Sequence, residues 1–119
     1  MKYDIKVTKS FEKEVKAIAK KQSSLKSDLK KFQEELIKNP RMGDEVTENV
    51  YKIRMAITSN NKGKSSGARI ITYLLEELPD MLPEEGLTKI YLLSIYTKSE
   101  KEDIENHEIE NLKKSIFDT

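Results

Sequence analysis

Two amphipathic helical stretches, which follow directly on an alternating strand, constrain the fold of this chain most strongly. Apolar residues recur at helical spacing on one side of residues 10–21 and again on one side of residues 25–39. Ser10 is expected to cap the first helix, and Asn39–Pro40 to end the second, because the residue before a proline leaves the helical region. Two helices that are joined by a short turn and are each apolar on one side require an apolar surface beneath them.

Four stretches with the alternation or apolar content of strands are predicted to supply that surface: residues 1–8, 50–57, 68–75 and 88–97. Within the second stretch, Tyr51 and Ile53 share one face. Lys52 and Arg54 share the other, so we expect the charged face of the sheet to lie opposite the helices. The last stretch is apolar on both faces, which is typical of a central strand.

The order of these elements is strand, helix, helix, three strands and helix, which predicts an α+β fold. We expect a four-stranded, largely antiparallel sheet with a two-helix hairpin packed on one face and a C-terminal helix. The helices are expected to lie on the same face, and the two-helix crossover can bring the first strand beside a later one. Ser99 and Glu102 have capping-box spacing and are expected to open the C-terminal helix. The length of 119 residues fits a single domain over residues 1–119.

The composition argues against several classes of protein. The chain has no cysteine, and therefore no disulfide or thiolate metal site, which fits a reducing compartment. No apolar run approaches the roughly 18 residues of a membrane span, and the N-terminus has no signal-peptide core. The carboxylates lack ligand spacing, so neither a metal nor another cofactor is expected. We expect a cytoplasmic protein that is not associated with a membrane.

Charge is sorted along the chain. Between Val50 and Ile70 there are five basic residues and no acidic one, in a chain whose formal net charge is +1. These residues are Lys52, Arg54, Lys62, Lys64 and Arg69. Such a cluster is typical of a site for a polyanion. An edge hairpin that carries lysines against aggregation gives the same pattern, so that interpretation stays open.

The segments YKIRMAI, KGKSSGARIITY and IYLLSIYTKSEKEDI, in this order, resemble the RelE/ParE toxin superfamily of bacterial type II toxin–antitoxin systems, and its HigB-like branch in particular. The resemblance covers nearly the whole chain. It implies a toxin that binds the ribosomal decoding site and cuts mRNA there. The partner that it implies is a cognate antitoxin, HigA-like and with a helix-turn-helix. The ParE branch instead poisons DNA gyrase.

The resemblance also implies roles for individual residues. Four basic residues match positions that the RNA-cutting branch keeps: Lys52, Arg54, Arg69 and Lys98. The RelE branch has an arginine directly after that last lysine, where this chain has Ser99. It also has a tyrosine in the C-terminal helix, whereas no tyrosine follows Tyr96 here. The RelE catalytic set is therefore incomplete in this chain.

Cleavage of RNA needs no metal, because the 2′-OH beside the scissile phosphate is the nucleophile. Arg54 and Arg69 are the expected phosphate clamps, since a guanidinium is planar and stays charged. Lys64 or Lys98 is expected to act as base or acid, because neighbouring cations lower the pKa of a lysine. Tyr96 is expected to donate a proton or to stack on a base.

Other lysines of the basic stretch are expected to attract the RNA backbone nonspecifically: Lys52, Lys62 and Lys64. The single histidine, His107, is interpreted as a solvated helix residue rather than a catalytic one. Two other functions stay open from the sequence. One is a noncatalytic, ParE-like inhibitor of gyrase, and the other is an RNA-binding toxin domain that has lost its activity.

Overall fold

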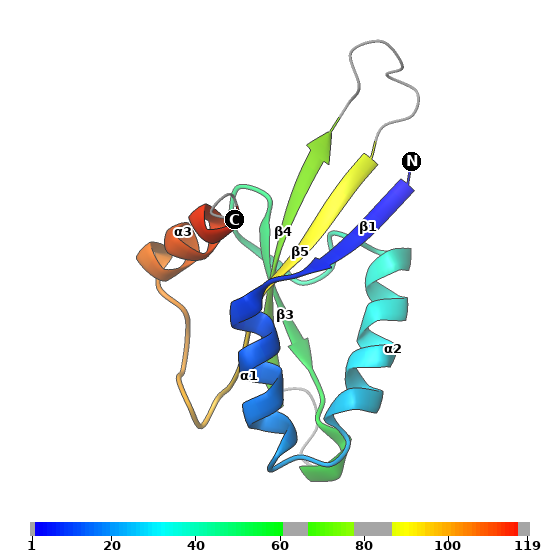
Figure 1. The fold of residues 1–119 in the computed structure, drawn as a ribbon, viewed down its shortest axis with the longest axis vertical. Coiled ribbons are helices and arrows are strands. Elements are labelled where there is room, and N and C mark those ends of the chain that lie inside the picture. The colour runs from blue at the N-terminus through cyan, green and yellow to red at the C-terminus, as the bar shows by residue number, and fades with distance from the viewer. Residues whose placement is uncertain (1, 61–66, 78–86, 117–119) are drawn as a thin grey trace.

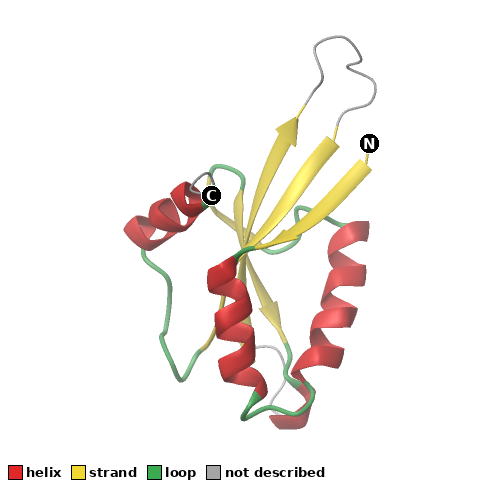
Figure 2. Cartoon of the chain, viewed as in Figure 1, coloured by secondary structure: helices red, strands yellow, loops and turns green. Residues whose placement is uncertain are grey.

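The computed structural model describes residues 2–60, 67–77 and 87–116 (Figures 1 and 2). Within these residues the chain forms five strands, three α-helices and one 3₁₀ helix. None of the described helices is long and apolar enough to cross a membrane. In chain order the elements are β1 (Lys2–Val7), α1 (Lys9–Ala19), α2 (Leu25–Lys38), β2 (Asp44–Thr47), β3 (Val50–Met55), η1 (Thr58–Asn60), β4 (Ala68–Glu77), β5 (Leu87–Thr97) and α3 (Asn106–Ser115).

The strands form one mixed sheet in the order β1-β5-β4-β3-β2. β1 runs parallel to β5, and the remaining neighbours are antiparallel. The α+β class is confirmed, and the two-helix crossover does place the first strand beside a later one. The expected number of four strands is wrong, because β2 is a fifth strand that the sequence does not predict. This edge strand has only four residues, DEVT, and three of them are exposed, so its sequence carries no alternation of buried and exposed positions.

β5 lies between β1 and β4, as its apolar sequence predicted. Its N-terminal part is flanked on both sides, since Leu87 to Leu92 pair with β1 as well as with β4. β1 stops at Val7 opposite Leu92, so beyond this point β5 has no strand on that edge. The rest of this edge is covered by α1, which begins directly after β1.

The start of α1 differs from the expectation in detail. Thr8, not Ser10, is the N-cap: its Oγ1 accepts a hydrogen bond from the backbone N–H of Phe11 at 3.2 Å. The Thr8 hydroxyl also donates to the carbonyl of Leu92 at 2.9 Å, so one side chain ties the start of the helix to β5. α2 ends as expected at Asn39, its C-cap residue.

The helical hairpin of α1 and α2 covers one face of the sheet. Phe11 and Phe32 are buried there, as predicted, and Leu29 is half-buried. Burial of each such apolar side chain contributes about 1.5–3 kcal/mol to the free energy of folding. Packing on the sheet therefore stabilises the two helices more than their intrinsic helix propensity does. The core joins both helices to three strands through Phe11, Ile18, Leu25, Phe32, Leu36, Tyr51, Ile53, Met55, Ile70, Leu74 and Ile90.

α3 packs on the opposite face of the sheet, apart from α1 and α2 (Figure 1). The expectation that all helices share one face is therefore wrong. β4 and β5 are apolar on both faces, and an uncovered second face would expose a large apolar patch to water. α3 covers that face, and a second, smaller core forms there from Val50, Ile71, Leu93, Tyr96, Ile104 and Ile109.

The start of α3 also corrects the sequence-based expectation. Residues 98–100 form a turn after β5, and the helix begins later, with Glu105 as its N-cap residue. The capping box joins Glu105 and Glu108, not Ser99 and Glu102. Both pairs have the same three-residue spacing, so only the packing of the following helix on the sheet decides between them.

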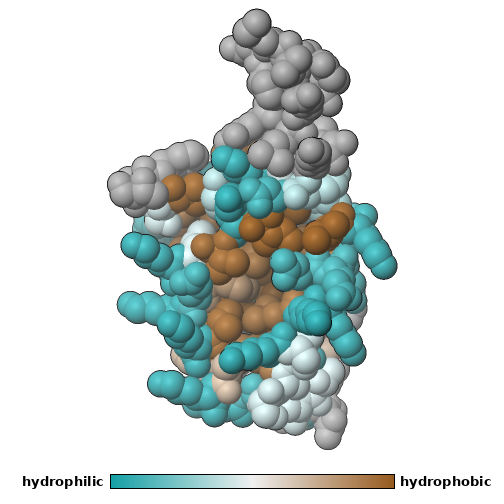
Figure 3. Space-filling view, turned by 45° about the vertical axis from the view of Figure 1, so that its right-hand side comes forward, coloured by the Kyte–Doolittle hydropathy of each residue, from teal (hydrophilic) through white to brown (hydrophobic). Residues whose placement is uncertain are grey.

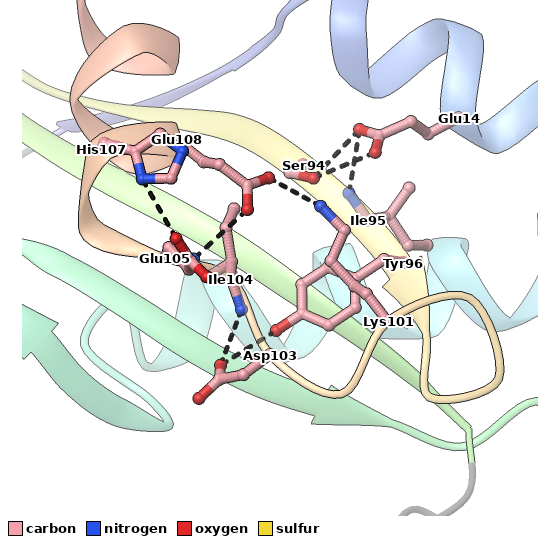
Figure 4. A network of polar contacts seen from close by, with 10 residues as sticks. All are labelled: Glu14, Ser94, Ile95, Tyr96, Lys101, Asp103, Ile104, Glu105, His107 and Glu108. Carbon is pink, nitrogen blue, oxygen red and sulfur yellow. Dashed lines mark hydrogen bonds and ion pairs between the residues drawn. The ribbon is translucent and has the colours of Figure 1, made fainter.

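Glu14 of α1 takes over the role of a strand along the open edge of β5. Its carboxylate accepts hydrogen bonds from the Ser94 hydroxyl at 3.1 Å and from the backbone N–H of Ile95 at 3.3 Å (Figure 4). Burial raises the pKa of Glu14, although these hydrogen bonds oppose the increase. The ionised carboxylate therefore accepts hydrogen bonds from donors at the open edge of β5, although its burial costs desolvation free energy.

We predict that Glu14→Ala lowers the free energy of unfolding by about 1–2 kcal/mol, because it leaves the buried Ile95 N–H without an acceptor. Glu14→Gln keeps an acceptor and should lose less of this free energy.

In the wild type, the raised pKa of Glu14 means that the free energy of unfolding falls as the pH rises from the ordinary glutamate pKa through the raised one. Glu14→Gln should remove this part of the pH profile, as measured by urea unfolding between about pH 4 and 7. An unchanged profile would contradict this role of Glu14.

Candidate functional site

Three predicted site residues lie in one row across the three central strands of the sheet, near one end of these strands. In the strand register Arg54 of β3 is directly opposite Arg69 of β4, and Arg69 is directly opposite Tyr96 of β5. Directly opposite side chains share a face, with Cβ atoms about 5 Å apart. The structure therefore brings together residues that lie up to 42 positions apart in the sequence, a number that follows from 96 minus 54.

This row lies on the face of the sheet that α3 shares, opposite the helical hairpin. Tyr51, Ile53 and Met55 point into the hairpin core, so the alternation of β3 turns Lys52 and Arg54 to the other face. The predicted separation of the charged face from the hairpin face is confirmed for Lys52, which contacts Asp103 on the α3 side, whereas Arg54, near the end of β3, also borders a pocket shared with α2. We call Arg54, Arg69 and Tyr96, together with Lys52, which lies on the same face two residues before Arg54 in β3, the cationic row.

Members of the cationic row differ in their exposure. Arg54 is exposed and Lys52 is half-buried, whereas Arg69 and Tyr96 retain only 7% and 2% of their surface. Tyr96 is held in the second core. Packing therefore fixes Arg69 and Tyr96 in place, whereas the side chains of Arg54 and Lys52 can adjust to a ligand.

The backbone on both sides of residues 61–66 is held in place by specific contacts. Gly67 lies against β3 so closely that a Cβ atom at this position would overlap the carbonyl oxygen of Met55. On the other side, Asp28 of α2 accepts hydrogen bonds from the backbone N–H of Thr58 at 3.0 Å and from its hydroxyl at 2.9 Å. The contact of Gly67 fixes the backbone directly before β4, and with it the position of Arg69. Two predicted RNA-binding residues, Lys62 and Lys64, lie outside the described residues.

Asp103, in the link between β5 and α3, contacts two members of the cationic row, Lys52 and Tyr96. One oxygen, Oδ1, accepts hydrogen bonds from the Tyr96 hydroxyl at 3.4 Å and from the Lys52 ammonium at 3.3 Å. The same oxygen accepts the backbone N–H of Ile104 at 2.8 Å, which orients the carboxylate (Figure 4). A single carboxylate oxygen thus meets two side chains that were predicted to contact RNA.

These contacts set the protonation states of the site. The backbone hydrogen bond from Ile104, followed by the contact with Lys52, lowers the pKa of Asp103. Burial raises the pKa of Tyr96 to about 12, and the negative charge of Asp103 adds to the increase. Tyr96 therefore keeps its proton at neutral pH and can act as a hydrogen-bond donor, not as a base.

Lys101 is a further cation beside Tyr96 that the sequence analysis did not single out. Its ammonium lies 5.5 Å from the centre of the Tyr96 ring and donates a hydrogen bond to Glu108 at 2.7 Å (Figure 4). Asp103 was missed as well. Both lie in the charged run KSEKED after β5, where alternating acids and bases resemble an ordinary solvated segment, so no spacing signal marks them.

Two other residues that the sequence analysis discussed lie away from these contacts. Lys98 is exposed in the turn after β5, and within the described part of the chain it has no polar partner. Its predicted catalytic role therefore has no support from the geometry and stays a prediction. His107 is exposed and lies 3.2 Å from the Glu105 carboxylate, as expected of a solvated helix residue.

The arrangement can hold an anion without a metal. The described residues include no group of three or more histidine, cysteine, aspartate or glutamate side chains placed to hold a metal ion. Guanidinium, ammonium and phenol groups converge instead, and these are donors suited to phosphate oxygens.

A comparison with models of known protein families finds none that matches this chain.

Proposed function

We propose that this chain is the toxin of a type II toxin–antitoxin system of the RelE/ParE kind, HigB-like, and a ribosome-dependent mRNA endoribonuclease. The observation that carries the proposal is the row Arg54–Arg69–Tyr96 across three adjacent strands. Arg54 and Arg69 are directly opposite each other, so two guanidinium groups, which are donors suited to phosphate oxygens, lie on one face. The sequence motifs that resemble the family fall on this row.

In this proposal each residue of the row has a distinct part in the reaction. The 2′-OH attacks the adjacent phosphorus, the bond to the 5′-oxygen breaks, and charge builds up on the phosphate oxygens. Arg69 stabilises that charge without reorganising, because it is buried and held in the central strand β4. Arg54, which is exposed, clamps the phosphate from the adjacent strand, and the protonated Tyr96 donates a hydrogen bond to it.

The proton transfers need a base and an acid. Lys98 and Lys64 stay the candidates from the sequence, and the ribosome supplies the position of the RNA. Positioned acid–base groups contribute about 10²–10⁴-fold in rate, so an enzyme of this kind depends on a partner that holds its substrate.

The first test is induced expression of the chain with mapping of transcript ends. Cuts inside translated reading frames are expected, and DNA breaks with intact mRNA would instead support a ParE-like gyrase inhibitor. We predict that Arg69→Ala lowers cleavage of mRNA on programmed ribosomes by roughly 10²–10³-fold, by analogy with the loss of one preorganised donor. Arg69→Lys should not restore cleavage, because lysine lacks the two-pronged contact.

Because Arg69 is buried, its replacement can also disturb the fold. Arg54→Ala removes an exposed side chain and should lower cleavage with little change in the melting temperature. Lys38→Ala, at the exposed end of α2 on the other face, is the matched control and should cleave like the wild type. Full cleavage by folded Arg54→Ala and Arg69→Ala proteins would remove the cationic row from the site.

An antitoxin has a suitable surface on the other face of the molecule. The hairpin leaves a groove of about 390 Å³ between α1 and α2, which Figure 3 shows as a hollowed brown strip with hydrophilic residues on both sides. Its walls are mostly apolar, and the polar residues beside them include two lysines and one acid: Lys16, Lys26, Glu12 and Gln33. Val7 and Ile37 are about half exposed on the elements that border it. We propose that the antitoxin places an apolar segment with acidic flanks here, which would leave the cationic row uncovered.

We predict that Val7→Lys weakens binding of the antitoxin encoded beside this gene by at least tenfold, because it puts a charge into the apolar wall. Val46→Lys is the matched control, since Val46 is also an exposed valine of a strand but lies on β2 at the far edge of the sheet. Isothermal titration of each purified variant measures the effect. Equal affinities for both variants would place the antitoxin elsewhere, with the cationic face as the alternative.

A further inference from the structure

We infer that Asp103 occupies the place of an RNA phosphate in the cationic row and thereby holds the free protein in a self-inhibited state. This inference rests on the proposed function, because it concerns the regulation of the same site. It assigns a role to the link between β5 and α3 that neither the sequence motifs nor the fold requires.

The first support is the choice of donors. Lys52 and Tyr96 are the groups that would donate to phosphate oxygens, and both donate to Oδ1 of Asp103. A carboxylate and a phosphate are both oxyanions that accept such hydrogen bonds. The two anions therefore compete for the same ammonium and hydroxyl groups, and they repel each other when both are present.

The second support is that the link does not need Asp103 in order to be held in place. Ile104 is buried in the second core at 8% exposure, and Lys101 is bonded to Glu108 of α3. At the other end, the backbone N–H groups of Glu100 and Lys101 donate to the Thr97 carbonyl at 3.0 and 3.2 Å. The link is fixed on both sides of Asp103, so the carboxylate is presented to the row by its surroundings.

The third support is that the contact can be displaced. The Asp103 side chain is 64% exposed, whereas Lys52 is 23% exposed. An ion pair with so much solvent on one side is weak, and rotation of the Asp103 side chain suffices to release it. The polyanionic RNA brings several phosphates and gains from every cation of the row, so it can replace one carboxylate.

A carboxylate at this position could instead be part of the catalytic machinery. The bond to Lys52 and the hydrogen bond from Ile104 stabilise the ionised form of Asp103, which makes it a weak base. Its negative charge also lies beside the cations that the transition-state phosphate needs. The geometry therefore favours inhibition, and the experiment separates the two roles.

The experiment compares Asp103→Asn with a neighbouring control. Asparagine keeps the shape of the side chain and an oxygen that can accept the Ile104 N–H, so only the charge is lost. Glu102→Gln removes the same charge from the adjacent residue, which is exposed and has no polar contact within the described residues. The probe is a fluorescein-labelled single-stranded RNA in which every 2′-OH is 2′-O-methyl, so that it binds but is not cleaved.

We predict that Asp103→Asn binds this RNA roughly 2- to 5-fold more tightly than the wild type at low salt, in keeping with the strength of an exposed ion pair. Glu102→Gln should change the affinity by less than half of that. The difference should shrink as salt is raised, because the competition is electrostatic. Equal affinities for the two variants would overturn the inference.

Cleavage on programmed ribosomes provides the second measurement. At subsaturating ribosome concentration Asp103→Asn should cleave mRNA faster than the wild type, and at saturation about equally fast. A loss of cleavage at saturation would overturn inhibition and make Asp103 part of the machinery. If the wild type, Lys52→Ala and Asp103→Asn all bind the RNA equally weakly, the proposed RNA site itself fails. If only the effect of Asp103 is missing, the site stands without self-inhibition.

Discussion

The structure depends on the apolar character of β4 and β5 on both of their faces. One face is covered by the hairpin of α1 and α2, and the other needs a cover of its own, which α3 provides. Because α3 follows β5 in the chain, the link between them must leave the end of β5 and return over the sheet. That path brings Asp103 to Lys52 and Tyr96. The requirement to bury the second face thus also positions the carboxylate in the site.

The same constraint explains how one face of the sheet can carry both a core and the proposed binding surface. α3 covers the part of the second face around Ile71 and Leu93, and the row from Arg54 to Tyr96 borders this second core through Tyr96, which belongs to it. In β3, charged and apolar residues therefore alternate between the two faces. In β4, the charged Arg69 lies near the start of the strand, before the apolar residues that pack under α3. A buried Arg69 between an exposed Arg54 and a buried Tyr96 gives the site a rigid centre and an adaptable rim.

Much of this arrangement could be predicted from the sequence, because period-two and helical patterns report which side of an element is buried. They located the hairpin, three of the strands around the site and the opposite face for Lys52 and Arg54. They did not reveal β2, whose exposed DEVT has no pattern, or the start of α3, where two capping boxes competed. Asp103 could not be found, because its role depends on the tertiary path of the link. The position of α3 followed from burial on both faces of β5, a signal that was present but was used only to place the strand in the sheet.

The most direct test of the account observes the three arginines of the chain by NMR. Arg54 and Arg69 belong to the cationic row, whereas Arg41 contacts Tyr51, whose side chain belongs to the hairpin core. During titration with the 2′-O-methyl RNA, the Nε–Hε signals of Arg54 and Arg69 should shift together and saturate, and that of Arg41 should stay in place. A shift of Arg41 alone, with Arg54 and Arg69 unchanged at saturating RNA, would contradict the assignment of the RNA site to this face.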